Sequence, residues 1–334
     1  MIGRGQSGYQ PTMKVYLGLL ESSRPDQTRI FGELEDKLFD VNLACAAHLA
    51  QSPAERASAY ALADFYFPKN IQGFLECGEC ARKMFDQVTA FAQTQGASKL
   101  RGTGGEKVVH EIAEIRVLPP LQKPNKSFVI GFSDRARAET LPRAEIPTAY
   151  YKLPQTLIAD SAPILWPKFS QELDADGCFA LVIGKPGRRI PAEKAWEYIA
   201  GVTLMVDLTA RDINRREGLT TNNLLGKNFP SSTCLGPAVL IGAARDTIEA
   251  MEHELFLDGE TKGRFSLSNC VFTVEQIIAG WSILGINPGD WLAIGASMAL
   301  SGDRLHPPVP LKIGSTIRCS SPLIGTLLHR VFSA

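Results

Sequence analysis

The amino-acid sequence contains no apolar run that approaches the ~20 residues needed to span a bilayer. It also has no excess of charge of either sign, because 35 Lys and Arg residues balance 35 Asp and Glu residues and leave a net charge of zero. These two absences predict a protein whose partner is neither a membrane nor a nucleic acid. Residues 1–8 also lack the apolar segment of a secretory signal, so we interpret residues 1–13 as a flexible tail.

Cysteine is scarce as well. The seven cysteines form an odd, scattered set, at positions 45, 77, 80, 178, 234, 270 and 319. Without an export signal, such a set predicts reduced thiols and a cytoplasmic protein. Cys77 and Cys80 make a lone C-x-x-C pair, which two thiols in a helical segment explain as well as a zinc or redox site does.

What the sequence does contain is ordinary for a globular protein, with 45% hydrophobic and 21% charged residues. Its length suits one large or two modest domains. Residues 14–18 and 32–41 have the character of strands, whereas the Ala-rich stretch 53–64, which opens with proline, and the apolar stripe of 68–95 predict helices. We therefore predict a small N-terminal α+β domain over residues 14–117.

The composition of the sequence changes after residue 117. A proline-rich segment, LPPLQKPN, occupies residues 118–125, and short apolar runs separated by glycine, proline and polar clusters follow it. Residues 273–285 alone have clear helical character there. This pattern predicts a β-rich second domain over residues 118–334, and an α+β fold class for the whole chain.

Several motifs in the second domain occur in the order found in one known family. They are PNKSFVIG (124–131), KLP (152–154), DADGCFALVIGK (174–185), GVTLMVDLTARDIN (201–214), KNF with LGP (227–229 and 235–237), PGD (288–290) and LKIG (311–314). On these motifs the chain resembles the fumarylacetoacetate hydrolase family. The resemblance implies a mixed β-roll, a homodimer, and chemistry on enolisable oxo or 1,3-dicarbonyl acids.

The resemblance also implies a divalent metal, usually Mg²⁺, held by two glutamates at alternate strand positions and one aspartate. Those positions hold Asp176, Cys178 and Asp207 in this sequence. Asp176 and Cys178 keep the i, i+2 spacing of the two family glutamates, so their side chains are expected on one face of the strand. Sulfur at Cys178 disfavours Mg²⁺, which prefers oxygen ligands. We therefore expect either no metal or an atypical divalent ion.

In the hydrolases of this family a His–Glu pair activates water. Here the His position is occupied by Arg137, and Glu139 lies one residue from the Glu position. Arginine cannot act as a base near neutral pH because its pKa exceeds ~12. Arg137 is therefore interpreted either as a carboxylate-binding residue or as a solvated charge, and Glu139 as a substrate contact. None of the five histidines lies in a catalytic motif of the family.

Oxyanion stabilisation has better candidates. The family resemblance assigns Arg211, Asn214 and Lys227 as donors to a developing oxyanion, and Lys152 as a contact for a substrate carboxylate. Arg211 could equally pair with Asp212, and Lys227 could lie on the surface in a turn. In the family's substrate loop, which here reads GASMAL (295–300), Ser297 and Met298 are the candidate substrate contacts.

These features lead to one main function and two alternatives. The main prediction is a divergent enzyme that stabilises an enolate of an enolisable oxo or 1,3-dicarbonyl substrate, by tautomerisation, decarboxylation, dehydration, cyclisation or C–C cleavage. The divergence of its site from the family suggests a specialised biosynthetic pathway. The first alternative is a metal-dependent C–C hydrolase of the acylpyruvate type. The second is an inactive homologue that serves as a binding or scaffold subunit.

Overall fold

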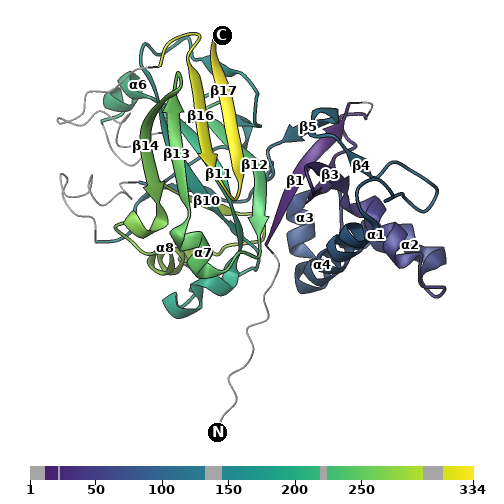
Figure 1. Cartoon of the computed structure of the whole chain (residues 1–334). Coiled ribbons are helices and arrows are strands. Elements are labelled where there is room, and N and C mark those ends of the chain that lie inside the picture. The colour runs from purple at the N-terminus through teal and green to yellow at the C-terminus, as the bar shows by residue number, and fades with distance from the viewer. Residues whose placement is uncertain (1–11, 22, 132–144, 219–223, 296–310) are drawn as a thin grey trace.

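The computed structural model describes residues 12–21, 23–131, 145–218, 224–295 and 311–334 (Figure 1). Its strands are β1 (Met13–Leu20), β2 (Arg29–Leu34), β3 (Lys37–Asp40), β4 (Val109–His110), β5 (Ile115–Leu118), β6 (Ser127–Ile130), β7 (Ala149–Tyr151), β8 (Leu157–Ile158), β9 (Ile164–Trp166), β10 (Leu173–Ile183), β11 (Ile199–Ala210), β12 (Thr233–Ile241), β13 (Glu252–Leu257), β14 (Glu260–Ser266), β15 (Trp291–Ile294), β16 (Thr316–Ser321) and β17 (Gly325–Ser333).

The α-helices are short, apart from α4. They are α1 (Val41–Leu49), α2 (Ala59–Tyr66), α3 (Ile71–Glu76), α4 (Gly78–Gln95), α6 (Arg211–Arg216), α7 (Arg245–Ala250) and α8 (Val274–Trp281). Turns of 3₁₀-helix are η1 (Arg56–Ser58), η2 (Ile112–Glu114), η3 (Pro154–Thr156), η4 (Ala192–Tyr198), η5 (Leu267–Asn269) and η6 (Ser282–Leu284). In the described part of the chain, no helix is both long enough and apolar enough to cross a bilayer.

Within the described residues the strands form two sheets. One has twelve strands, with the main order β4-β3-β2-β1-β12-β11-β10-β15-β6-β7, while β5 pairs with β1 and β8 with β12. The other has five strands, in the order β14-β13-β16-β17-β9. Most pairs are antiparallel, but β15–β6, β12–β8 and β17–β9 are parallel. The predicted α+β class with mixed sheets is therefore confirmed.

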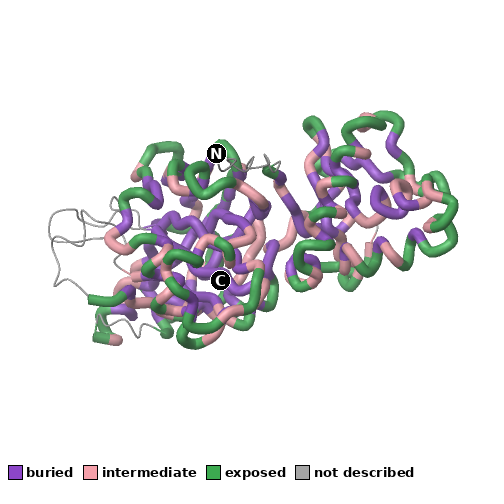
Figure 2. The backbone as a smooth tube through the Cα atoms, turned by 90° about the horizontal axis from the view of Figure 1, so that it is seen from below, coloured by how far each residue is buried: buried purple, intermediate pink, exposed green. Residues whose placement is uncertain are grey.

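Strand β10 is buried on both faces. Phe179, Leu181 and Ile183 belong to a core with side chains of the five-stranded sheet and of α8. The alternate residues Ala180 and Val182 belong to a second core that includes side chains of helices α1–α4. Buried stretches run through both parts of the molecule in Figure 2. This double burial explains why the segment reads as a continuous apolar run rather than as an alternating strand.

Strand β1 links the two predicted domains, because it pairs with β12 with Met13 opposite Ile241 and Val15 opposite Val239. One sheet therefore crosses the boundary that the sequence suggested at residue 118. Helices α1–α4 cluster with β1–β5, on the right of Figure 1, and the roll formed by the later strands lies on the left. The division at 117/118 itself stays a prediction, and residues 1–11 lie outside the described part.

Several boundaries in the first region differ from the sequence prediction. The range 32–41 is not one strand, because Glu35 adopts a left-handed conformation that turns β2 into β3. The range 68–95 divides into α3 and α4 at Cys77, and the next residue, Gly78, has a φ of 66°. The helix expected from residue 53 begins at Ala59, after turns and η1.

Helix α1 was not predicted. Asp40 caps it, since its carboxylate accepts the backbone N–H of Leu43 at 3.0 Å. The helix is apolar on most of its surface, so the sequence lacks the contrast between faces that marks an amphipathic helix.

The buried His253 on β13 predicts a pH-dependent stability. It lies between Phe179, with ring centroids 4.9 Å apart, and Phe265, at 5.5 Å. Burial lowers the pKa of His253 from 6.5 to about 4. As the pH falls below 6.5, the His253 imidazole binds a proton more readily in the unfolded state than in the folded state. The free energy of unfolding therefore decreases between about pH 6.5 and pH 4. Between pH 7 and pH 5 we expect His253 to cost about 2 kcal/mol.

Urea unfolding at pH 7 and pH 5, for wild type and His253→Phe, measures this effect. The raised pKa of Asp174 acts in the opposite direction over the same range, so only the difference between the two proteins isolates His253. We expect the variant to lose less stability than the wild type on acidification. An equal loss in both proteins would show that folding does not lower the pKa of His253.

Candidate active site

Charged side chains gather where β10 begins and β11 ends. Asp174, Asp176 and Cys178 occupy alternate positions of β10 and so share one face of the sheet. The antiparallel register sets Asp176 directly opposite Asp207 on β11, and Asp174 opposite Thr209. The pairing therefore brings carboxylates that are distant in sequence onto one small patch.

Asp207 is the centre of this patch and is fully buried. Lys152 donates to its Oδ1 at 2.8 Å, and Lys227 donates to its Oδ2 at 2.6 Å. The hydroxyl of Tyr150, on β7, also donates to Oδ2. Both lysines are buried as well, at 1% and 5% exposure. One carboxylate thus faces two ammonium groups inside the protein.

This arrangement sets the protonation of the group. Burial alone would raise the pKa of Asp207, but the charges and hydrogen bonds of Lys152 and Lys227 outweigh it and hold the pKa below its usual range. Burial lowers the pKa of Lys152, an effect that Lys227 reinforces and Asp207 opposes. Burial and the Asp207 charge raise the pKa of Tyr150, which keeps the phenol as a donor. Asp207 is therefore ionised at neutral pH.

The two lysines differ in what remains of their hydrogen-bonding capacity. The ammonium of Lys152 has three N–H groups, and it meets Asp207, the backbone carbonyls of Lys227 and Ser232, and the Ser232 hydroxyl. Lys227 bonds Asp207 and, at 2.6 Å, the Thr209 hydroxyl. Lys152 is thus saturated by the protein, whereas Lys227 keeps one N–H that no described residue accepts.

Arg211, the first residue of α6, points into the same patch. Its Nη2 and Nε lie 2.6 and 2.7 Å from Oδ2 of Asp174, and Nη2 lies 3.5 Å from Oδ2 of Asp176. Asp212 instead accepts from the Ser170 hydroxyl and from the backbone N–H of Gln171. Burial and the Asp176 charge raise the pKa of Asp174 to about 7, although Arg211 opposes the shift.

The charges in this cluster balance. Three carboxylates, Asp174, Asp176 and Asp207, face three cations, Lys152, Lys227 and Arg211. Asp176 is the least satisfied member: its buried Oδ1 has no hydrogen-bond partner among the residues that the structure describes, and its Oδ2 lies 4.0 Å from Nζ of Lys227. We call these six residues the ion cluster.

The ion cluster does not fit the divalent metal that the family resemblance implies. Both oxygens of Asp207 already accept from lysines, and the ammonium of Lys227 lies between Asp207 and Asp176. Cys178 is buried, and burial together with the two aspartates raises the pKa of its thiol, so it is a poor ligand for a hard ion. In the described ranges, no group of three or more His, Cys, Asp or Glu side chains is arranged to hold a metal.

The loop that carries Lys227 is held from both sides. The Glu217 carboxylate accepts the backbone N–H groups of Leu225 and Gly226 at 2.8 and 2.9 Å. A side chain at Gly226 would collide with α6, because its Cβ would lie 3.1 Å from the backbone nitrogen of Asn214. Glycine therefore lets the loop approach α6 closely enough to turn Lys227 inward.

Asn228 ties this loop to the segment of Lys152. Its Oδ1 accepts the N–H of Leu153 at 2.6 Å, and its Nδ2 donates to the carbonyls of Tyr151 and Leu224 at 2.9 and 3.0 Å. The side chain of Asn228 thus connects the segment that carries Lys152 to the loop that carries Lys227.

Replacement of Asn228 by alanine is expected to lower both stability and turnover. Loss of three hydrogen bonds should cost about 1–3 kcal/mol of unfolding free energy. Turnover should fall more than the Michaelis constant changes, because Lys227 loses its fixed position. Asn228→Asp is the matched control, since it keeps the acceptor for Leu153 and loses only the donors. A variant with wild-type stability and kinetics would contradict this role.

The remaining predicted residues have different outcomes. Asn214 is buried on α6, beyond Arg211 on the same short helix. Arg137, Glu139, Ser297 and Met298 lie outside the described residues. Tyr150, Asp174, Thr209 and Asn228 were not predicted, although alternation along the chain could have suggested the first three: each lies two residues from a predicted member on the same face. No described histidine touches the ion cluster.

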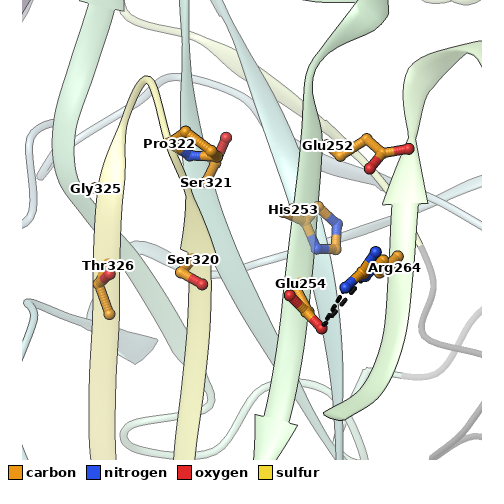
Figure 3. Close-up of a pocket in the computed structure, with 9 residues that line it drawn as sticks. All are labelled: Glu252, His253, Glu254, Arg264, Ser320, Ser321, Pro322, Gly325 and Thr326. Atoms are coloured by element: carbon orange, nitrogen blue, oxygen red, sulfur yellow. Dashed lines mark hydrogen bonds and ion pairs between the residues drawn. The ribbon is translucent and has the colours of Figure 1, made fainter.

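A separate pocket lies away from the ion cluster. It has a volume of about 520 Å³ and lies against the five-stranded sheet (Figure 3). Its lining includes Glu252, Glu254 and Arg264, with Arg264 paired to Glu254. None of its residues belongs to the ion cluster, and it shows no concentration of charge of one sign.

Comparison with known proteins agrees with the motifs. Residues 129–332 match the model of the fumarylacetoacetate (FAA) hydrolase C-terminal family. The mitochondrial oxaloacetate tautomerase fahd2 of Xenopus laevis is 30% identical over 326 residues, which cover 96% of this chain and 91% of that protein. The oxaloacetate tautomerase YisK of Bacillus subtilis is 28% identical over 230 residues, with 67% and 75% coverage.

Solved structures show the same fold. The fumarylacetoacetate hydrolase of Exiguobacterium antarcticum matches with a TM-score of 0.70 at 20% identity, over 96% of this chain and all of that one. A maleylpyruvate hydrolase of Sphingobium sp. SYK-6, in complex with manganese(II) and pyruvate, matches with a TM-score of 0.68 at 16% identity and the same coverage. The broad prediction of an enzyme that acts on an enolisable oxo substrate is confirmed, with the reaction type open. This chain belongs to the fumarylacetoacetate hydrolase family.

Proposed function

We propose that this protein interconverts the oxo and enol forms of a 2-oxo acid, with a dicarboxylic acid of the oxaloacetate class as its substrate. One observation carries the proposal: a buried ammonium, that of Lys227, is held by Asp207 and Thr209 and retains one N–H that no residue in the described ranges accepts. Curated relatives at 30% identity, from Xenopus laevis and Rattus norvegicus, are oxaloacetate tautomerases, which supports the substrate class.

Tautomerisation requires fewer catalytic groups than the other reactions considered. A base takes a proton from the carbon beside the carbonyl, negative charge develops on the carbonyl oxygen, and that oxygen is then protonated. Asp176, whose Oδ1 has no hydrogen-bond partner among the described residues, is the carboxylate of the ion cluster available to carry this proton. The transition state therefore needs positive donors at that oxygen, and Lys227 and Arg211 supply them in a preorganised, dry setting. Removal of one such donor typically costs about 3 kcal/mol of transition-state stabilisation. The reaction needs neither water nor a redox partner.

Hydrolysis of a C–C bond is the alternative that the solved hydrolases suggest. It requires a base that activates water, and Arg137 occupies the position where the family has its histidine. The residues of the ion cluster offer cations and paired carboxylates instead. An inactive binding subunit is the remaining alternative, and it requires that no oxo acid turns over at all.

An enol-absorbance assay distinguishes these functions. Oxaloacetate prepared in its enol form loses ultraviolet absorbance as it converts to the oxo form, and the protein should accelerate that decay. An acylpyruvate of similar size should release no carboxylic acid. Acylpyruvate cleavage would favour the hydrolase. Absence of any turnover with 2-oxo acids, together with ligand binding by calorimetry, would favour the binding subunit.

Three further features belong to this proposal. Six of the seven cysteines, Cys45, Cys77, Cys80, Cys178, Cys234 and Cys319, carry free thiols, which supports a reducing compartment such as the cytoplasm. The family resemblance supports a homodimer, and the altered metal-ligand and base positions support a role in a biosynthetic pathway. Size-exclusion chromatography with light scattering tests the dimer directly.

A further inference from the structure

The ammonium of Lys227 occupies the place where a divalent cation would have to lie. We propose that this ammonium replaces the metal: it is a cation built into the chain that polarises the substrate's carbonyl oxygen, so that the ion cluster works without a divalent ion. This inference rests on the proposed function, and the disagreement between the ion cluster and the metal leads to it.

The position of Nζ is the first step. It lies 2.6 Å from Oδ2 of Asp207, 2.6 Å from the Thr209 hydroxyl and 4.0 Å from Oδ2 of Asp176. It also lies 4.7 Å from the centre of the Tyr150 ring. A metal bridging Asp176 and Asp207 would have to displace this group, because both cannot bind the same carboxylate oxygens.

The ligand set is the second step. A hard divalent ion needs several oxygen ligands, and Cys178 offers sulfur where a carboxylate would be required. Asp207 has no free oxygen, since Lys152 and Lys227 take one each. Asp176 alone keeps an unpartnered oxygen, and one monodentate carboxylate does not hold a metal.

The charge balance is the third step. With all three carboxylates ionised, the ion cluster has no net charge, so a divalent ion would add two positive charges that no member of the cluster offsets. A bound 2-oxo acid instead adds negative charge, which Lys227 can meet with its remaining N–H. Lys152, whose donors are all taken, holds the loop of Lys227 through its bond to the Lys227 carbonyl. It is a positioning residue.

Metal titration tests this inference independently of turnover. The full-length protein, stripped with EDTA, is titrated with Mn²⁺ and Mg²⁺ by calorimetry, and no saturable binding at millimolar concentration is expected. Mn²⁺ binding that is lost in Asp176→Asn would overturn the proposal. Binding that survives this substitution lies elsewhere on the protein and leaves the ion cluster free of metal, as proposed.

Chemical rescue provides the second test. Lys227→Ala should lose activity about 100-fold or more, and ethylammonium in the buffer should restore it severalfold while Mn²⁺ should not. Restoration by Mn²⁺, or loss of wild-type activity in EDTA, would show that a metal supplies the charge. If Lys227→Ala does not fold, the wild-type titration and the EDTA assay still decide. An absence of oxaloacetate tautomerisation in the wild type would refute the proposed function without affecting the metal titration.

Discussion

Replacement of Lys227 by methionine is expected to lower the rate of tautomerisation by about 10²–10³-fold. Methionine is unbranched like lysine and only one atom shorter, but it carries no charge and no donor. The hydrogen bonds to Asp207 and Thr209 are lost, together with the N–H that we assign to the substrate's oxygen. The turnover number from the enol-absorbance assay measures the effect.

The matched control is Lys194→Met, because Lys194 is exposed on η4 and has no role in the ion cluster. Its turnover should equal that of the wild type. Thermal unfolding of both variants separates loss of chemistry from loss of fold. A folded Lys227→Met protein that retains more than a third of wild-type turnover would contradict the role of Lys227 in catalysis.

Replacement of Asp207 by asparagine is expected to destabilise the protein by about 3–5 kcal/mol. The substitution keeps the shape of the side chain but leaves Lys152 and Lys227 buried beside each other without a counter-charge. The lowered pKa of Asp207 means that the ionised carboxylate favours the folded state. That contribution is complete at neutral pH and is lost only as the pH falls below the ordinary range of an aspartate.

Urea unfolding at pH 7 measures this loss, and Asp26→Asn serves as the control because Asp26 is exposed in a turn. The control should change stability by less than about 0.5 kcal/mol. An Asp207→Asn protein as stable as the control would mean that the two lysines are neutral or solvated in the folded state. Activity should fall in the same variant, since Lys227 loses the carboxylate that orients it.

Some of the fold could be predicted from the sequence because its signals are local. The apolar run of β10, the helical stripe of α4 and the ordered motifs from residue 124 onward predicted the α+β class and the family correctly. Helix α1 was missed because its residues are apolar on most sides, so no periodicity distinguishes it from a buried strand. The break between α3 and α4 depends on a single residue in a left-handed conformation.

The ion cluster also contains residues that could be predicted from the sequence and contacts that could not. The resemblance of short motifs to the family was sufficient to select Asp207, Arg211 and Lys227, because each motif is a short stretch of chain. The partner of Arg211 is the opposite case: the sequence left Asp212 open as its partner, and the strand register supplies Asp174 instead, 37 residues earlier.

What the sequence determined by itself is therefore the family, the fold class and the residue types of the site. Tertiary structure alone decided which charges meet. Lys152 and Asp207 lie 55 residues apart in the chain, and their contact exists because β7, β11 and the loop of Lys227 converge. The physical reason is that motif spacing is a property of local chain geometry, whereas the pairing of buried charges depends on strand register and on desolvation, which arise only when distant segments pack together.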